Sequence, residues 1–278
     1  MLDAFSTIAQ GLDHPEGVAW GPDGRVYAGG EAGQIYVMTL EGDVKQEADT
    51  GGFVYGIALD GDGNIYACDT GRTEVVRVSP SGQAESYSKG TPERPMRVPN
   101  FPSFDPAGNL YVTDSGEWGA DDGLIYRVEP GGKTFVWTEA VPRYPNGCCM
   151  SLRGDALLVI ESRGRSISSV PILDDGTAGP PEELADLTGS LPDGLALAAD
   201  GTIFVGCYRP DRIYRIPPAG DPEVWADDPD GVVLNQPTNL AFAGPDLDRI
   251  VVASLGGWSL AMAEAERVGA PLHYPRIA

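Results

Sequence analysis

The sequence is poor in basic residues, in histidine and in cysteine, and each scarcity excludes a class of function. Lysine and arginine number 19 against 41 aspartates and glutamates, for a net charge of −22. Nucleic acids and anionic membranes need a basic face, so we expect neither as a partner. With two histidines, His14 and His273, the chain offers no histidine-rich zinc site and no credible Ser-His-Asp set.

The four cysteines, Cys68, Cys148, Cys149 and Cys207, include no CxxC pair. We interpret them as reduced, packed thiols rather than as redox or metal ligands. No apolar run approaches the roughly 18 residues of a membrane span, and the first residues show neither a basic nor an apolar signal region. We therefore expect a cytoplasmic protein.

What the chain does have is a repeat. A Pro-X-Gly-like turn, a short apolar strand, an Asp-Gly or related turn and a second apolar strand occur six times, 39 to 47 positions apart. The same position of each copy is taken by Glu16, Tyr55, Asn100, Asn146, Asp193 and Thr238. In five copies a turn glycine follows that position by eight residues. Two further strands follow in most units, as in QIYVMTL and VKQEAD of the first.

Four short strands per unit and a period near 45 are typical of propeller blades. We therefore predict an all-β protein, one six-bladed β-propeller domain over residues 1–278 with four-stranded antiparallel blades. A surplus strand at residues 4–10 precedes the first unit and can complete the last blade, which closes the ring and removes open strand edges. The stretch 261–268 has helical propensity, which conflicts with this prediction. We expect the propeller architecture to outweigh that propensity.

In a propeller, the innermost strand of each blade begins at one mouth of the central channel, so the six repeat positions should form a ring there. Glu16, Asn100, Asn146 and Asp193 would offer oxygen ligands with two negative charges, which suits a hard divalent cation. The loops at this mouth also carry acids, among them Asp69, Asp114, Glu117 and Glu161. The simpler interpretation is that Pro-Glu-Gly, Pro-Asn-Gly and Pro-Asp-Gly are ordinary turns. Their common register favours a metal site.

At these residues the chain resembles the SMP-30/gluconolactonase/luciferin-regenerating-enzyme family of six-bladed propellers. The resemblance covers essentially the whole chain and includes the motifs 15–17, 105–114, 145–147, 192–194, 236–239 and 271–275. It implies that Glu16, Asn146 and Asp193 hold one catalytic divalent cation, with Asn100 against the metal or the substrate. Ca²⁺ is the ion we expect first, with Mg²⁺, Mn²⁺ or Zn²⁺ as alternatives.

The family resemblance implies a metal-dependent hydrolase that opens a lactone ring. We expect Asp193 as general base and Asn100 as the residue that orients a small-molecule substrate, and no protein partner is implied. Asp114 or Glu117 are alternative bases. A phosphotriesterase on the same metal site and a non-hydrolytic binding or bond-forming propeller remain alternatives.

The third blade departs from the sugar-lactonase pattern, in which an arginine lies two residues before the asparagine. Here Val98 takes that place, with Arg97 one residue further away. Aromatic residues near the same mouth indicate a more apolar substrate. We expect the pocket to be lined by Tyr55, Phe101, Trp118, Tyr208 and Trp258.

Overall fold

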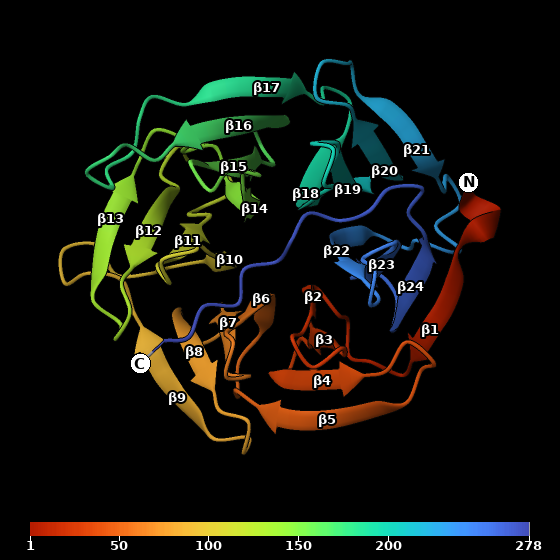
Figure 1. Ribbon diagram of the computed structural model, residues 1–278, viewed down its shortest axis with the longest axis horizontal. Coiled ribbons are helices and arrows are strands. Elements are labelled where there is room, and N and C mark those ends of the chain that lie inside the picture. The colour runs from red at the N-terminus through yellow and green to blue at the C-terminus, as the bar shows by residue number, and fades with distance from the viewer. Residues whose placement is uncertain (278) are drawn as a thin grey trace.

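Six four-stranded antiparallel sheets stand around a central channel in the computed structural model, which describes residues 1–277 (Figure 1). The predicted six-bladed β-propeller is thereby confirmed. The only helix among the described residues is the 3₁₀ turn η1 (Leu2–Ala4), and none is long and apolar enough to cross a membrane.

Within each blade the strands are paired in chain order from the channel outward, as the hydrophobic repeats predict. The first three blades comprise β2 (Val18–Trp20), β3 (Val26–Gly29), β4 (Gln34–Met38) and β5 (Val44–Asp49); β6 (Val54–Leu59), β7 (Ile65–Asp69), β8 (Glu74–Val78) and β9 (Ala84–Ser88); and β10 (Pro99–Phe104), β11 (Leu110–Asp114), β12 (Leu124–Val128) and β13 (Thr134–Thr138). The next two comprise β14 (Pro145–Met150), β15 (Ala156–Glu161), β16 (Ser166–Pro171) and β17 (Glu182–Asp186); and β18 (Leu191–Leu197), β19 (Ile203–Arg209), β20 (Asp211–Ile216) and β21 (Glu223–Asp227).

The sixth blade combines the two ends of the chain. It comprises β22 (Pro237–Ala243), β23 (Arg249–Ser254), β24 (Ser259–Glu264) and the N-terminal strand β1 (Ser6–Gln10), which pairs with β24 as the outermost strand. The helix-prone stretch therefore begins as a strand, because pairing with both β23 and β1 outweighs local propensity.

Neighbouring blades bury the core between them. The second strands β3, β7, β11 and β15 are buried along their whole length, and β19 and β23 along most of theirs, whereas the outermost strand β5 is largely exposed. Cys68, Cys148 and Cys207 are buried, Cys149 is half-buried, and all four are free thiols. This agrees with their interpretation as packing residues.

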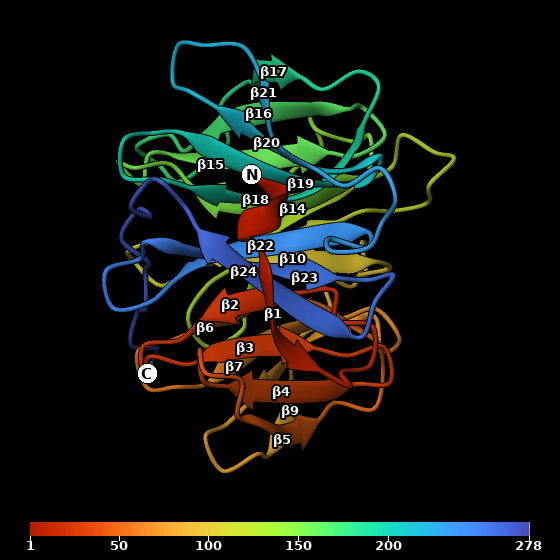
Figure 2. The same cartoon turned by 90° about the vertical axis from the view of Figure 1, so that its right-hand side faces the viewer.

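The segment that follows β24 crosses the face of the propeller seen in Figure 1 and lies along one side in Figure 2. Residues 270–274 of this segment help to line a cavity of about 350 Å³ in the channel, together with the innermost strands of all six blades. Among the described residues that line this cavity, the titratable side chains are those of His273, Tyr274, Cys148 and Cys149. Its apolar walls offer no set of metal ligands.

Candidate metal centre

The six ring positions lie where the innermost strands begin. In five of the six blades, the ring position falls within a β-bulge. The pairing register shifts between Val54 and Ile57, Pro99 and Pro102, Pro145 and Cys148, Pro192 and Leu195, and Pro237 and Leu240. A bulge interrupts the alternation of a strand and changes the direction of a side chain. We attribute the orientation of Asn100, Asn146 and Asp193 to these bulges.

Glycines let the innermost strands approach one another directly behind the ring. A Cβ on Gly147 would lie 2.6 Å from Gly194 Cα and 2.7 Å from the Asp193 carbonyl oxygen. A Cβ on Gly17 would lie 1.9 Å from the Tyr55 carbonyl oxygen. In these Pro-X-Gly turns the glycine is therefore required by close contact with the next blade.

Gly147→Ala should lower the free energy of unfolding by roughly 1–3 kcal/mol, because the methyl group meets rigid backbone of the fifth blade. It should also weaken any function that depends on Asp193. Gly119→Ala is the matched control, since a Cβ there has nothing within 4 Å, and it should change stability by less than about 0.5 kcal/mol. Urea denaturation measures both. Equal stability of the two variants would contradict this account of the glycine.

The four proposed ligands are buried, with side chains exposed by 4% at Glu16, 1% at Asn100, 3% at Asn146 and 4% at Asp193. One oxygen of each has no hydrogen-bond partner: Glu16 Oε2, Asn100 Oδ1, Asn146 Oδ1 and Asp193 Oδ1. Buried polar atoms without partners are rare, and each needs an explanation such as a bound ion. Four such oxygens at one register of the repeat fit a hard cation.

Serine residues hold the two amides. Asn100 Nδ2 donates to Ser115 Oγ, and Asn146 Nδ2 donates to Ser162 Oγ, both at 3.0 Å. Ser115 in turn donates to the carbonyl oxygen of Pro145 at 2.8 Å, which links the third blade to the fourth. With their amino groups engaged, the two asparagines keep their carbonyl oxygens as the free atoms.

The negative charges of Glu16 and Asp193 influence each other's ionisation. Burial raises the pKa of Glu16 well above its usual range, and the negative charge of Asp193 raises it further. Burial also raises the pKa of Asp193 to about 7, although a hydrogen bond from the Asn146 side chain lowers it. Two carboxylates that oppose each other's ionisation form a site that favours a positive charge.

Three tyrosines surround these carboxylates. Burial raises the pKa of Tyr55, Tyr144 and Tyr208, and the charges of Glu16 and Asp193 raise each of them further. Tyr55 and Tyr208 were predicted from the sequence. Tyr144 was not, although its position two residues before Asn146 was visible.

The other predicted residues lie in different surroundings. Phe101 contacts Gly56 of the neighbouring blade and lines the apolar cavity, so it is part of the channel wall. Trp118 and Trp258 are exposed in loops at the ring face. Thr238 Oγ1 donates to the Glu16 carbonyl oxygen at 2.8 Å, so its hydroxyl supports the chain rather than a ligand.

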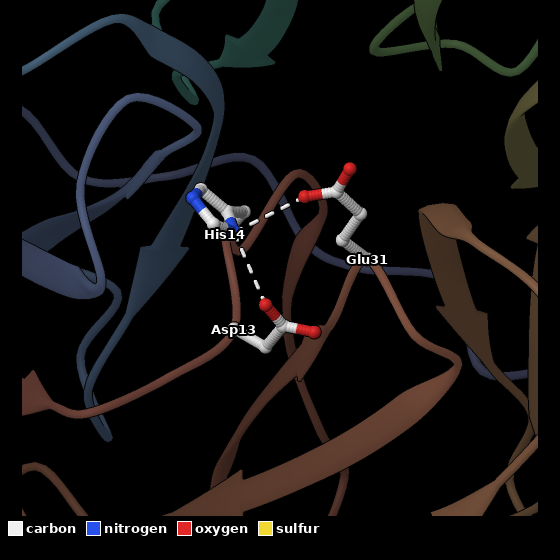
Figure 3. A group of neighbouring side chains, drawn as sticks. All are labelled: Asp13, His14 and Glu31. Atoms are coloured by element: carbon white, nitrogen blue, oxygen red, sulfur yellow. Dashed lines mark hydrogen bonds and ion pairs between the residues drawn. The ribbon is translucent and has the colours of Figure 1, made fainter.

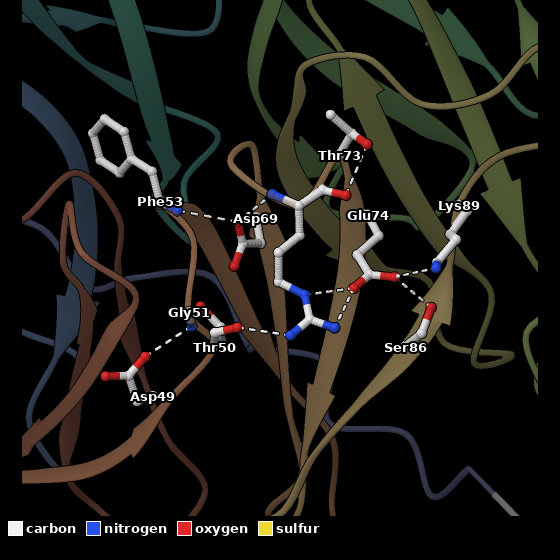
Figure 4. Close-up of polar contacts among 10 residues, drawn as sticks. Asp49, Thr50, Gly51, Phe53, Asp69, Thr73, Glu74, Ser86 and Lys89 are labelled. Carbon is white, nitrogen blue, oxygen red and sulfur yellow. Dashed lines mark hydrogen bonds and ion pairs between the residues drawn. The ribbon is translucent and has the colours of Figure 1, made fainter.

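Acids at the ends of second strands hold the loops that lead into the ring. The Asp69 carboxylate accepts from the backbone nitrogens of Phe53 and Arg72 (Figure 4). Asp114 accepts from the backbone nitrogens of Arg97, Val98 and Gly116. Glu161 accepts from that of Arg143 at 2.8 Å. Asp114 accepts three backbone hydrogen bonds in this way, so we interpret it as a positioning residue rather than a base. Asp69 keeps one buried oxygen, Oδ2, without a partner. Glu117 is exposed.

A second cluster, Asp13, His14 and Glu31, brings three possible metal ligands within 4.8 Å of one another (Figure 3). His14 Nδ1 lies 3.1 Å from both Asp13 Oδ1 and Glu31 Oε2. Trp258 Nε1 donates to His14 Nε2 at 2.9 Å. These contacts assign the tautomer of His14 with its proton on Nδ1, which is shared between the two carboxylates, while Nε2 accepts from Trp258. Both ring nitrogens therefore have hydrogen-bond partners without a bound ion.

The sequence profile of the SMP-30/gluconolactonase/LRE-like region matches residues 31–256, and residues 1–38 match the N-terminal part of strictosidine synthase-like proteins. The pentonolactonase XacC of Haloferax volcanii is 25% identical over 250 residues, 87% of this chain and 81% of that protein.

Two solved structures illustrate the shared fold. The gluconolactonase XC5397 of Xanthomonas campestris has a TM-score of 0.80 at 20% identity and covers 94% of this chain and 89% of its own. Regucalcin of Agrobacterium tumefaciens, a calcium-binding protein, has a TM-score of 0.76 at 19% identity, with 99% and 98% covered.

Proposed function

Because the chain belongs to the SMP-30/gluconolactonase/LRE-like family, we propose that it is a lactonase that uses one divalent cation at the ring mouth. The single observation that carries the proposal is the set of four buried, unpartnered oxygens on Glu16, Asn100, Asn146 and Asp193. The names of the relatives, a pentonolactonase and a gluconolactonase, support lactones as the substrate class.

Glu16, Asn146 and Asp193 would hold the cation, with Asn100 as a fourth ligand or a contact to the substrate. Ca²⁺ is the ion we expect, because the donor set contains oxygen only and a calcium-binding protein shares the fold. Bound there, the cation would supply positive charge that polarises the lactone carbonyl group.

Asp193 is our choice of general base. A carboxylate in the ring can reach a water held beside the cation, which is the position that a general base needs. It would take the proton from the water that attacks the carbonyl carbon. The Asn146 amide, held by Ser162, keeps this carboxylate in place.

Tyr55, Tyr144 and Tyr208 would act as neutral donors. Their raised pKa values keep the phenols protonated at physiological pH, so they can donate hydrogen bonds but cannot serve as bases. We propose that they hold the ring oxygen and the carbonyl group of the substrate and exclude bulk water.

The proposal is tested with a panel of sugar, aliphatic and aromatic lactones plus one phosphotriester, each assayed with and without a chelator. We expect at least one lactone to be hydrolysed, at a rate that falls more than about 100-fold with the chelator and recovers with Ca²⁺. Hydrolysis of the phosphotriester alone would favour that alternative. No chelator-sensitive turnover of any lactone would contradict the proposed function.

A further inference from the structure

Two tryptophans are exposed at the face where the ring opens. Trp118 lies in the loop between β11 and β12 and is 45% exposed, and Trp258 lies between β23 and β24 and is 62% exposed. Large apolar side chains that stay exposed at the rim of a site are candidates for contact with its ligand. Both loops lie at the face where the innermost strands begin.

Each tryptophan packs against a residue that lies two positions before a proposed ligand. Trp258 contacts His14, which precedes Glu16, with ring centres 5.6 Å apart and planes at 76°. Trp118 contacts Tyr144, which precedes Asn146, with ring centres 4.8 Å apart and planes at 72°. Edge-to-face contacts of this kind orient aromatic rings.

His14 and Tyr144 also share an uncommon backbone conformation. Their φ values are 42° and 63°, in the left-handed region that bulky residues other than glycine rarely adopt. Strained residues persist where the surrounding structure fixes them, and they are frequent at functional sites. The same strain occurs at the same repeat position in three blades, because Gln236, two residues before Thr238, has a φ of 59°.

The two aromatic pairs lie on opposite sides of the channel. One bridges the sixth and first blades, and the other bridges the third and fourth (Figure 1). His14 is further fixed by Asp13 and Glu31 (Figure 3). The two pairs therefore belong to opposite sides of the propeller, each next to a proposed ligand.

The cationic side chains beside the second pair are already paired. Arg97 forms an ion pair with Asp122 at 2.7 Å, and Arg163 pairs with Asp121. With these guanidinium groups engaged, the side of the mouth at Trp118 offers flat apolar faces, and among the described residues Arg209, exposed at the end of β19 beside Tyr208, is a cation without an ion pair. A neutral substrate with an apolar ring fits these surroundings better than one covered with hydroxyl groups.

We propose that Trp258–His14 and Trp118–Tyr144 form an aromatic clamp that selects lactones carrying an aromatic or other apolar ring over polyhydroxylated sugar lactones. This inference rests on the proposed lactonase function and names its substrate class. The cation that Glu16, Asn146 and Asp193 would hold acts on the lactone group, and the clamp binds the apolar part of the same substrate.

The clamp is tested with three lactones: dihydrocoumarin, which carries an aromatic ring, glucono-1,5-lactone, which carries hydroxyl groups, and δ-valerolactone, which carries neither. The wild-type protein should prefer dihydrocoumarin to the sugar lactone. Trp118→Ala and Trp258→Ala should each lower kcat/KM for dihydrocoumarin roughly tenfold, through a higher KM, and change that for δ-valerolactone less than about twofold. Val224→Ala removes an exposed apolar side chain of an outermost strand and serves as the matched control. Equal losses on both lactones, or a preference for the sugar lactone, would overturn the clamp.

A second measurement separates failure of the clamp from failure of the hydrolase. The lactam 3,4-dihydro-2-quinolinone has the shape of dihydrocoumarin and resists hydrolysis, so its Kd can be measured by calorimetry whether or not the protein is an enzyme. Binding that weakens roughly tenfold in both tryptophan variants supports the clamp even if no lactone is turned over. Lactone hydrolysis together with lactam binding that is independent of both tryptophans would overturn the clamp and leave the lactonase intact.

Discussion

Asp193→Asn should lower kcat/KM for lactone hydrolysis by at least about 1,000-fold and weaken Ca²⁺ binding. The substitution keeps the size of the side chain and its contact with Asn146, but it removes a negative charge from a site with two carboxylates. It also removes the proposed general base, and loss of such a group alone typically costs 10²- to 10⁴-fold. Steady-state kinetics and calcium calorimetry measure the two effects.

Asp200→Asn is the matched control for this prediction. Asp200 lies in the turn at the other end of the same pair of strands, β18 and β19, and is exposed. It should retain nearly wild-type activity and calcium affinity. If Asp193→Asn were as active as the wild type, or if both variants lost activity equally, the assignment of Asp193 would be wrong.

In the protein without its cation, ionisation of Asp193 should destabilise the fold increasingly as the pH rises from about 4 to 8. Burial raises the pKa of Asp193 from 3.8 to about 7 in the folded protein. The folded state therefore binds the proton more tightly than the unfolded chain, so the carboxyl costs nothing below the unfolded pKa and destabilises the fold increasingly up to the folded pKa. Ionisation of Asp193 alone should lower the free energy of unfolding by about 4 kcal/mol at pH 8.

Comparison with Asp193→Asn isolates this effect from the other acids. In the presence of a chelator the variant should be more stable than the wild type at pH 8, and the difference should shrink toward zero at pH 4. Added Ca²⁺ should reverse the order at pH 8, because it binds the folded wild type more tightly. Urea denaturation at the two pH values measures this. A difference that does not depend on pH would contradict the buried carboxylate pair.

The blades could be predicted from the sequence because period and turn glycines recur in register. The ring positions were equally visible, since Pro-X-Gly turns mark the starts of the innermost strands. The surroundings of the ring were less visible. Ser115 and Ser162 are revealed as partners of Asn100 and Asn146 only when second and first strands pair.

Side-chain direction was the weakest part of the sequence interpretation. Phe101 was expected at the mouth beside Asn100, but it lies against Gly56 of the preceding blade and lines the apolar cavity, next to the bulge between Pro99 and Pro102. The loop acids Asp69, Asp114 and Glu161 looked like site residues. Each of them accepts hydrogen bonds from backbone amides, and a sequence does not reveal which backbone group a carboxylate will meet.

The central claim is that Glu16, Asn146 and Asp193 meet around one divalent cation. Crystals soaked with Mn²⁺, whose anomalous scattering locates the ion, test it most directly. We predict one strong anomalous peak on the channel axis, about 2.0–2.6 Å from an oxygen of each of the three side chains. A map with no peak at the ring, or with its only peak at Asp13, His14 and Glu31, would contradict the account.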